Sequence, residues 1–317
     1  MTRKLIYFFA YLGSVFLFYF AGCENARQGT PQLLSGGEIP VVAQKDEPQR
    51  IISTVPSVTE TLFELGLGDR VVGVSEFCNY PESARSLPRT GGYLNPNFEA
   101  MIELSPDLVI VLAEAVELQN RLESFGIAYL AVDHKSIDGI LDSLVQIGNR
   151  CGAKSAKRAN ELQTEINNQL DDIAKRTANL DKPKVVVTLY FDDDTVMQSA
   201  TIVGNSPFFE QVFELAGGVN VAQNAKIAFP TISREGIMEL NPDYIIGLAD
   251  ENANNPQTIE NFNKNWGQFA SRSPAVENRQ LVLVAEDYAL VPGPRFVLLV
   301  EKIAKILHSE KFYTVAR

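Results

Sequence analysis

Short apolar runs rich in β-branched residues alternate along the chain with stretches in which apolar residues recur at helical spacing. The alternation pauses near residue 150 and returns from Lys184 onward. The runs that predict strands are 51–54, 71–74, 108–112, 129–132, 185–189, 244–248 and 281–284, and the stretches that predict helices are 136–149, 208–216 and 295–308. This alternation predicts an α/β fold with mainly parallel sheets flanked by helices.

Three positions carry the signals of helix N-termini. Ser57-Val-Thr-Glu60 has the spacing of a capping box, which predicts that a helix begins at Ser57. Asn97 and Ser233 suit the N-cap position, which places Glu99 and Glu235 in the first turns of two short helices. A carboxylate in a first turn is stabilised by the helix dipole whether or not it has a partner.

The stretch 153–180 contains no Gly or Pro and is rich in Ala, Glu, Gln, Leu and Lys, which are good helix formers. We therefore predict one long helix there. A continuous helix holds its ends at a fixed separation, so it predicts a rigid bridge between an N-terminal lobe (50–152) and a C-terminal lobe (181–317). The predicted fold is two lobes, each a mainly parallel sheet flanked by helices.

The two halves share repeated sequence. Glu99-Ala-Met-Ile-Glu-Leu-Ser-Pro-Asp107 matches Glu235-Gly-Ile-Met-Glu-Leu-Asn-Pro-Asp243, and in both an apolar run follows. A second pair, Phe63-Glu-Leu-Gly-Leu-Gly and Phe213-Glu-Leu-Ala-Gly-Gly, precedes the first pair in the same order. These matches predict a duplicated unit. Duplicated lobes that face each other leave a cleft, which is a favoured place for a ligand.

The N-terminus has the layout of an export signal. Arg3 and Lys4 precede an apolar run over 5–21, and Ala21-Gly22-Cys23 resembles the lipobox of bacterial lipoproteins. We expect a lipoprotein-type signal peptide over 1–23, with Cys23 lipidated, and a flexible polar tether over 24–49. The alternatives are an uncleaved anchor or plain secretion. The lipoprotein and both alternatives place the folded part of the chain, from residue 50 onward, in the periplasm or at the cell surface.

Composition argues against several classes of function. The formal net charge of −11, without a basic cluster, argues against nucleic acid as a partner. The two histidines, His134 and His308, are too few for a transition-metal site, and neither a nucleophile–base arrangement nor a P-loop is visible. For Asp192-Asp-Asp194 a solvated turn is favoured over calcium. We expect no enzyme, no catalytic residue and no bound metal, and Cys78 and Cys151 could pair or stay free.

Six motifs carry a family resemblance. They are Arg50-Ile-Ile-Ser-Thr-Val-Pro-Ser-Val-Thr-Glu60, Val72-Gly-Val-Ser, Tyr80-Pro81, Leu104-Ser-Pro-Asp-Leu-Val-Ile110, Phe229-Pro-Thr-Ile-Ser-Arg-Glu235 and Pro292-Gly-Pro-Arg295. In this order and spacing they resemble the vitamin B12-binding proteins of ABC importers. These proteins belong to the wider iron-siderophore, haem and cobalamin periplasmic-binding family of the helical-backbone type (class III). The resemblance covers about residues 50–308.

The resemblance implies a monomeric, extracytoplasmic solute-binding protein that delivers its ligand to a membrane permease served by a separate ATPase subunit. It implies permease docking through Glu99 and Glu235, and no covalently bound cofactor. The implied ligand is a corrinoid, cobalamin or cobinamide; an iron siderophore, haem or a non-transport sensor function are the alternatives. The positions implied to contact the ligand are Phe77, Tyr93, Tyr190, Phe229, Asp287 and Tyr288.

Overall fold

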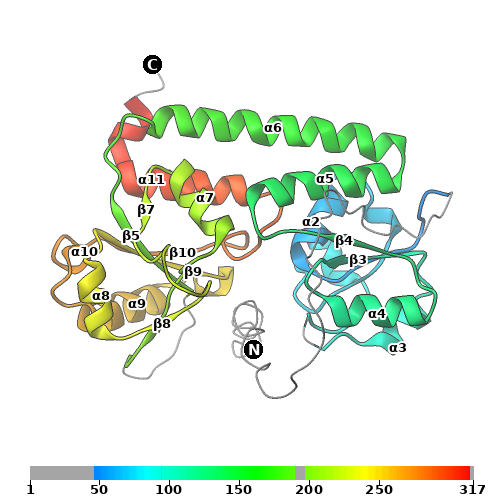
Figure 1. Cartoon of the computed structure of the whole chain (residues 1–317), viewed down its shortest axis with the longest axis horizontal. Coiled ribbons are helices and arrows are strands. Elements are labelled where there is room, and N and C mark those ends of the chain that lie inside the picture. Colours follow the sequence, from blue (N-terminus) through cyan, green and yellow to red (C-terminus); the bar gives the residue numbers. More distant parts are fainter. Residues whose placement is uncertain (1–45, 94, 190–196, 315–317) are drawn as a thin grey trace, which may run out of the picture.

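In the computed structural model, which describes residues 46–93, 95–189 and 197–314, two lobes lie side by side along one long helix (Figure 1). Each lobe contains a four-stranded sheet with parallel pairing. The predicted α/β class with two lobes is therefore confirmed. The predicted leader, Cys23, most of the tether, Tyr190 and Asp192–Asp194 lie outside the described residues.

The sheet of the N-terminal lobe has the strand order β2-β1-β3-β4. Its strands are β1 (Ile51–Ser53), β2 (Val71–Val74), β3 (Leu108–Leu112) and β4 (Tyr129–Val132). The helices of this lobe are α2 (Pro56–Glu64), η1 (Gly68–Arg70), η2 (Glu82–Ser86), α3 (Phe98–Glu103), α4 (Val116–Ser124) and α5 (Ile137–Cys151). The four strands lie where the apolar runs predicted them.

The sheet of the C-terminal lobe has the order β10-β9-β5-β7. Its strands are β5 (Lys184–Leu189), β7 (Val219–Asn220), β9 (Tyr244–Ala249) and β10 (Leu281–Ala285), and β6 (Ala200–Thr201) pairs antiparallel with β8 (Thr231–Ile232). The helices are α7 (Pro207–Leu215), α8 (Arg234–Leu240), η3 (Glu251–Ala253), α9 (Pro256–Phe269), α10 (Pro274–Glu277) and α11 (Phe296–Thr314). The two-residue strands β6, β7 and β8 were not predicted, because they are too short to show alternation.

The sequence repeat encodes a repeated contact. In the order of pairing, β1, β2, β3 and β4 correspond to β5, β7, β9 and β10. The Asp107 carboxylate accepts hydrogen bonds from the backbone N–H of Gln49 (2.7 Å) and Arg50 (2.9 Å), at the start of β1. The Asp243 carboxylate accepts one from the N–H of Lys184 (2.8 Å), at the start of β5. Each Pro-Asp pair thus fixes the first strand of its lobe beside the third.

The bridge between the lobes is α6 (Ala153–Thr177), somewhat shorter than the predicted stretch 153–180. Gly152 joins it to α5 with a φ of 118°, in the region that favours glycine, so the chain can reverse between two abutting helices. The helix packs against α5 of the first lobe and α11 of the second. Its buried face consists of Ser155, Ala159, Leu162, Ile166, Leu170, Ile173 and Thr177.

One apolar core is shared by both lobes. Successive strand residues point to opposite faces of a sheet. Ile51 and Ile110 of the first sheet and Val185 and Ile246 of the second contribute to a single continuous buried cluster that includes the inner face of α6. The alternate strand residues fill two separate clusters, one within each lobe. The lobes are therefore joined by buried apolar contacts as well as by the bridging helix.

The predicted N-caps at Asn97 and Ser233 are confirmed, because their side chains accept hydrogen bonds from the N–H groups of Ala100 (3.1 Å) and Gly236 (3.3 Å). The predicted capping box at Ser57 is wrong. The helix begins at Pro56 with Val55 as its N-cap, and no side chain caps it. Proline suits the first helical position, which moves the helix start toward the N-terminus. The Ser57 hydroxyl lies against His134 instead.

Cys78 and Cys151 are both buried and free, which answers the question that the sequence left open. The Thr59 hydroxyl donates a hydrogen bond to the Cys78 sulfur (3.0 Å), and Ser75 Oγ lies at 3.0 Å from the same atom. Burial raises the pKa of both thiols, that of Cys151 to about 11. Both side chains are therefore protonated near neutral pH and serve as small core groups.

His134 joins α2 to α5 inside the first lobe. The Ser143 hydroxyl donates to the Ile140 carbonyl (2.7 Å), so it accepts from His134 Nε2 (2.8 Å), and Nδ1 then accepts from Ser57 (2.8 Å). The imidazole is therefore neutral in the folded chain. Complete burial lowers the pKa of His134 from 6.5 to about 4.

This burial predicts a loss of stability in mild acid. Below pH 6.5 His134 becomes protonated in the unfolded chain, whereas in the folded chain it stays neutral until about pH 4. The free energy of unfolding therefore falls as the pH drops through this window. Between pH 7.5 and pH 5, wild type should lose about 2 kcal/mol more free energy of unfolding than His134→Gln. Urea unfolding at the two pH values measures this difference. Equal losses in the two proteins would show that His134 does not cause the pH dependence.

Candidate functional site

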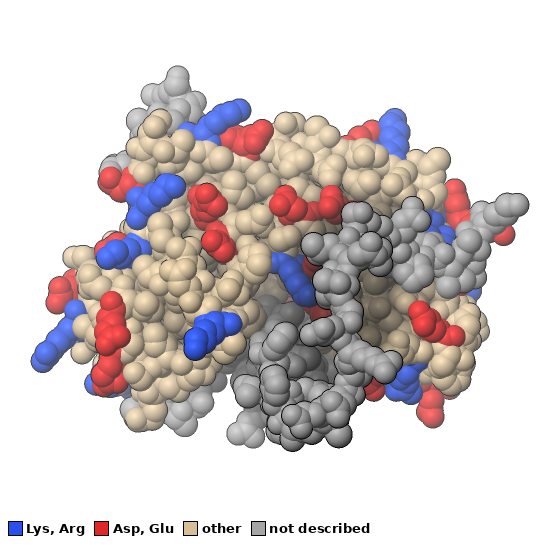
Figure 2. All heavy atoms as spheres, viewed as in Figure 1, with Lys and Arg blue, Asp and Glu red and all other residues tan. Residues whose placement is uncertain are grey.

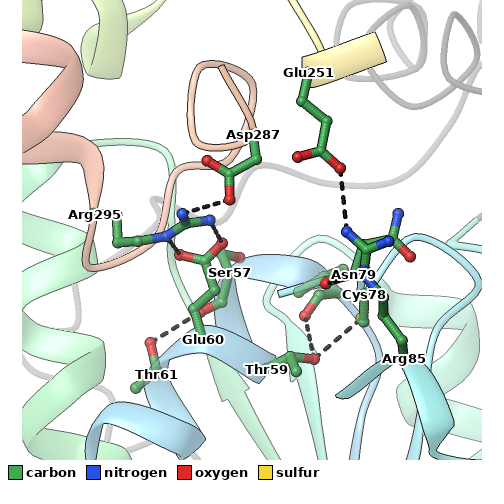
Figure 3. Close-up of polar contacts among 11 residues, drawn as sticks. Ser57, Thr59, Glu60, Thr61, Cys78, Asn79, Arg85, Glu251, Asp287 and Arg295 are labelled. Atoms are coloured by element: carbon green, nitrogen blue, oxygen red, sulfur yellow. Dashed lines mark hydrogen bonds and ion pairs between the residues drawn. The ribbon is translucent and has the colours of Figure 1, made fainter. Parts of the chain in front are cut away.

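Side chains from both lobes meet where the loop 286–295 lies against α2 (Figure 3). Arg295 Nε donates to one oxygen of Glu60 (3.0 Å) and Nη2 donates to the other (2.7 Å). Arg295 Nη1 donates to Asp287 (2.6 Å). Tyr80 completes the group, with the Arg295 guanidinium carbon 3.5 Å from its ring centroid. We call Glu60, Tyr80, Asp287 and Arg295 the seam cluster.

The members of the seam cluster differ in burial. The Glu60 side chain is 2% exposed, that of Arg295 13% and that of Asp287 33%. Burial raises the pKa of Glu60, although the hydrogen bonds and charge of Arg295 oppose this shift. Burial also disfavours a charged Arg295, but its bonds to Glu60 and Asp287 outweigh that effect and raise its pKa. The guanidinium therefore stays charged between its two carboxylates.

Close backbone approach makes this contact possible. A Cβ added to Gly293 would lie 3.1 Å from the Ser57 Cα and 3.2 Å from a Glu60 carboxylate oxygen. A larger residue at this position would therefore push the loop 286–295 away from α2. Glycine in the Pro292-Gly-Pro-Arg295 motif lets the loop sit close enough for Arg295 to reach Glu60.

A second ion pair joins the lobes at a more exposed position. Arg85 of η2 donates to Glu251 of η3 (3.2 Å), as Figure 3 shows, and also pairs with Glu82 (3.1 Å). The side chains of Arg85 and Glu251 are 48% and 51% exposed. An exposed pair contributes little to stability, about 0 to 1 kcal/mol.

A hollow lies at the carboxyl edge of the first sheet. Its lining includes Thr54, Ser75 and Ala115, which follow β1, β2 and β3, together with Gly92 and Tyr93. The Phe77 ring lies beside Gly92, at 3.6 Å from the position of an added Cβ. The hollow has a volume of about 250 Å³ with open solvent included, so the space that the protein itself encloses is smaller.

The carboxylates predicted to dock a permease lie at equivalent places in the two lobes. Glu99 and Glu235 are both exposed, each in the first turn after its confirmed N-cap. Hydrogen bonds from its own backbone N–H and from Ser233 lower the pKa of Glu235. Their helices, α3 and α8, both lie on the side of the molecule away from α6 (Figure 1). Figure 2 shows acidic and basic side chains interspersed over both lobes rather than gathered in one patch.

Comparison with known proteins agrees with this geometry. The sequence profile of the periplasmic binding protein family matches residues 51–288. The chain belongs to this family.

Two relatives and one solved structure illustrate the likeness. YvrC of Bacillus subtilis, named an uncharacterized ABC transporter substrate-binding lipoprotein, is 28% identical over 310 residues, which cover 92% of this chain and 94% of YvrC. The vitamin B12-binding protein of Vibrio vulnificus is 29% identical over 266 residues, 81% of this chain and 89% of the relative. The haem-binding protein RhuT from Roseiflexus has a TM-score of 0.68 at 22% identity, over 85% of this chain and 99% of RhuT, which shows the fold alone.

The structure of this periplasmic binding protein groups some of the predicted ligand residues. Asp287 and Tyr288 lie together at the seam, with the Tyr288 ring centroid 5.9 Å from the Arg295 guanidinium carbon. Tyr93 lines the hollow of the first lobe, and Phe77 lies beside Gly92 of the same lining. Phe229 is half-buried in the segment before β8. Tyr93, Phe229 and Tyr288 all pack against the shared core.

Sequence reasoning missed the residues that join the lobes, namely Glu60, Tyr80, Arg85, Glu251 and Arg295. Glu60 had a detectable signal, because it is a charged residue flanked by the apolar and hydroxyl-bearing residues 56–59 and 61–63 of α2. A buried charge requires a partner. The partner lies 235 positions away along the chain, so no local pattern could identify it.

In residues 46–93, 95–189 and 197–314, no group of three or more His, Cys, Asp or Glu side chains is placed to hold a metal ion. Within the same ranges, no helix combines the length and apolar content needed to cross a membrane.

The two ion pairs predict different costs of removal. Arg295→Met leaves Glu60 buried without its cation, so it should lower the free energy of unfolding by about 3 to 5 kcal/mol. Arg85→Met removes exposed pairs and should cost about 0 to 1 kcal/mol. Urea unfolding followed by the fluorescence of buried Trp266 measures both variants. Similar losses in the two variants would contradict the assignment of Glu60 and Arg295 as the stabilising contact.

Proposed function

We propose that this chain, an extracytoplasmic substrate-binding protein of the ABC transporter kind, captures a corrinoid between its two lobes and delivers it to a membrane permease. The observation that carries the proposal is the meeting of the two lobes at the seam cluster. There Asp287 and Tyr288 from one lobe lie beside Tyr80 from the other. A ligand held between the lobes would contact groups from both.

Two features favour a corrinoid as the ligand. Aromatic side chains give a flat macrocycle a large contact area at low conformational cost, and Phe77, Tyr80, Tyr93 and Tyr288 supply such rings. The partly exposed Asp287 can accept hydrogen bonds from the peripheral amides of a corrinoid. The Vibrio vulnificus relative is named for vitamin B12 binding, which supports the same choice. The haem-binding RhuT shares the fold, so fold by itself does not select the ligand.

We also propose that the protein is a monomer anchored in a membrane through a lipid on Cys23, with 24–49 as tether. The arrangement of positive, apolar and small residues before Cys23 supports this, and YvrC is named a lipoprotein. The end of the tether contacts the body, since Glu47 pairs with Arg70 (3.2 Å) and Gln49 binds Asp107.

Docking through Glu99 and Glu235 completes the proposal. Two exposed carboxylates on separate lobes can address two basic sites on a permease at once. Because exposed ion pairs are weak, the two glutamates would orient the encounter more than they hold the complex. Their equivalent positions in duplicated helices, on the side away from α6, support this role.

Ligand binding is tested by calorimetry on the full chain in detergent with cobalamin, cobinamide, haem and a ferric siderophore. We expect saturable one-to-one heat with cobalamin or cobinamide. Tyr288→Ala should weaken that binding about tenfold, because the ring is lost from the seam. Tyr129→Ala is the matched control, since Tyr129 lies at the opposite, amino end of β4 and donates to Glu123 (2.7 Å). Heat only with haem or the siderophore would overturn the corrinoid assignment.

Docking is tested by ATP-driven uptake in cells. The double variant Glu99→Lys with Glu235→Lys should lower uptake at least about tenfold, because both docking charges are reversed. Glu103→Lys with Glu239→Lys is the control, because these exposed glutamates lie on the same two helices and change the net charge equally. Ligand affinity should be the same in both double variants. Normal uptake with the first pair reversed would exclude docking through Glu99 and Glu235.

A further inference from the structure

The seam cluster contains more negative than positive charge. Glu60 and Asp287 are two carboxylates, and Arg295 is the one guanidinium between them. Three N–H groups of Arg295 are already donated to these carboxylates, and one face of the guanidinium lies on the Tyr80 ring. The cation is therefore already paired within the protein, and with both carboxylates ionised the group carries one net negative charge.

Two arginines of the first lobe, Arg85 and Arg89, are also paired with groups of the protein. Arg85 pairs with Glu82 and Glu251 and donates to the Asn79 carbonyl (3.0 Å). Arg89 donates to the carbonyls of Ser75 and Cys78, both at 2.9 Å. These guanidinium groups bind acceptors of the chain itself, which satisfies them without a ligand.

We propose that the cleft selects its ligand by charge, with Asp287 as the specificity-determining residue. Because Asp287 and Glu60 hold Arg295, the seam favours neutral or cationic metal macrocycles over those that carry carboxylates. This inference rests on the proposed function only in placing the ligand between the lobes. Asp287 sets the selection because it is the most exposed of the three charged side chains and so faces a bound ligand most directly.

The size of the effect follows from the Coulomb interaction. The negative charge of the seam cluster would repel a ligand carboxylate that lies several ångströms away. With an effective dielectric constant between those of protein and water, this repulsion corresponds to about tenfold weaker binding. Salt screens charges that remain in contact with solvent, so the discrimination should shrink as ionic strength rises.

The test compares ligands of equal size and different charge on the full chain in detergent. Cyanocobalamin is compared with its monocarboxylate derivatives, in which one peripheral amide has been hydrolysed to a carboxylate. At low salt, wild type should bind the monocarboxylates about tenfold more weakly than cyanocobalamin. In Asp287→Asn this ratio should fall to about threefold or less. Glu161→Gln, which removes one negative charge from the exposed face of α6, should keep the wild-type ratio.

A second ligand pair separates charge selection from the corrinoid assignment. If no corrinoid binds, haem is compared with its dimethyl ester, and the uncharged ester should bind more tightly to wild type. Charge selection is overturned if wild type binds the carboxylate form of either ligand as tightly as its uncharged counterpart, or more tightly. Corrinoid binding without discrimination would leave the proposed function intact. A chain that binds neither series would overturn both proposals.

Discussion

The bond between Glu60 and Arg295 is the contact on which the arrangement of the two lobes at the seam depends. A carboxylate that is 2% exposed is costly unless a cation meets it with good geometry, and Arg295 meets both of its oxygens. To do so, the loop 286–295 must lie against α2, which Gly293 permits. Seating this loop places Asp287 and Tyr288 at the seam. The need to neutralise one buried charge in the first lobe therefore positions candidate ligand groups of the second.

The lobes are joined in two physically different ways. One face of each sheet contributes to a single apolar core around α6, and a continuous helix resists bending between its ends. These features limit how far one lobe can move against the other. Arg85 and Glu251, by contrast, meet across exposed 3₁₀-helices, where water can replace either partner at little cost. Movement between the lobes would therefore concentrate at the exposed contact, while the buried seam and α6 hold the lobes in register.

Local sequence predicted the parts of the fold that have local causes. Apolar runs located β2, β3 and β4 to the residue, and the absence of Gly and Pro located α6. The capping box at Ser57 and Glu60 was predicted wrongly, because the same spacing occurs whether or not the two side chains bond to the backbone N–H groups of their own helix. In the structure they turn away from it, Ser57 to His134 and Glu60 to Arg295. The family resemblance supplied Asp287 and Tyr288 as candidates, but only the structure shows that they share a seam.

The duplicated lobes meet through two related contacts that differ in charge. By the repeated Phe-Glu-Leu motif, α2 corresponds to α7, which aligns buried Glu60 with exposed Glu210. The connection after β4 has four residues, 133–136, whereas the one after β10 has ten, 286–295. The short connection brings α5 only to Gln211 of α7, whose side chain accepts from the Ile137 N–H (2.7 Å). The longer one carries Asp287 and Arg295 to α2. Equivalent contacts are thus a neutral hydrogen bond in one direction and a charged cluster in the other.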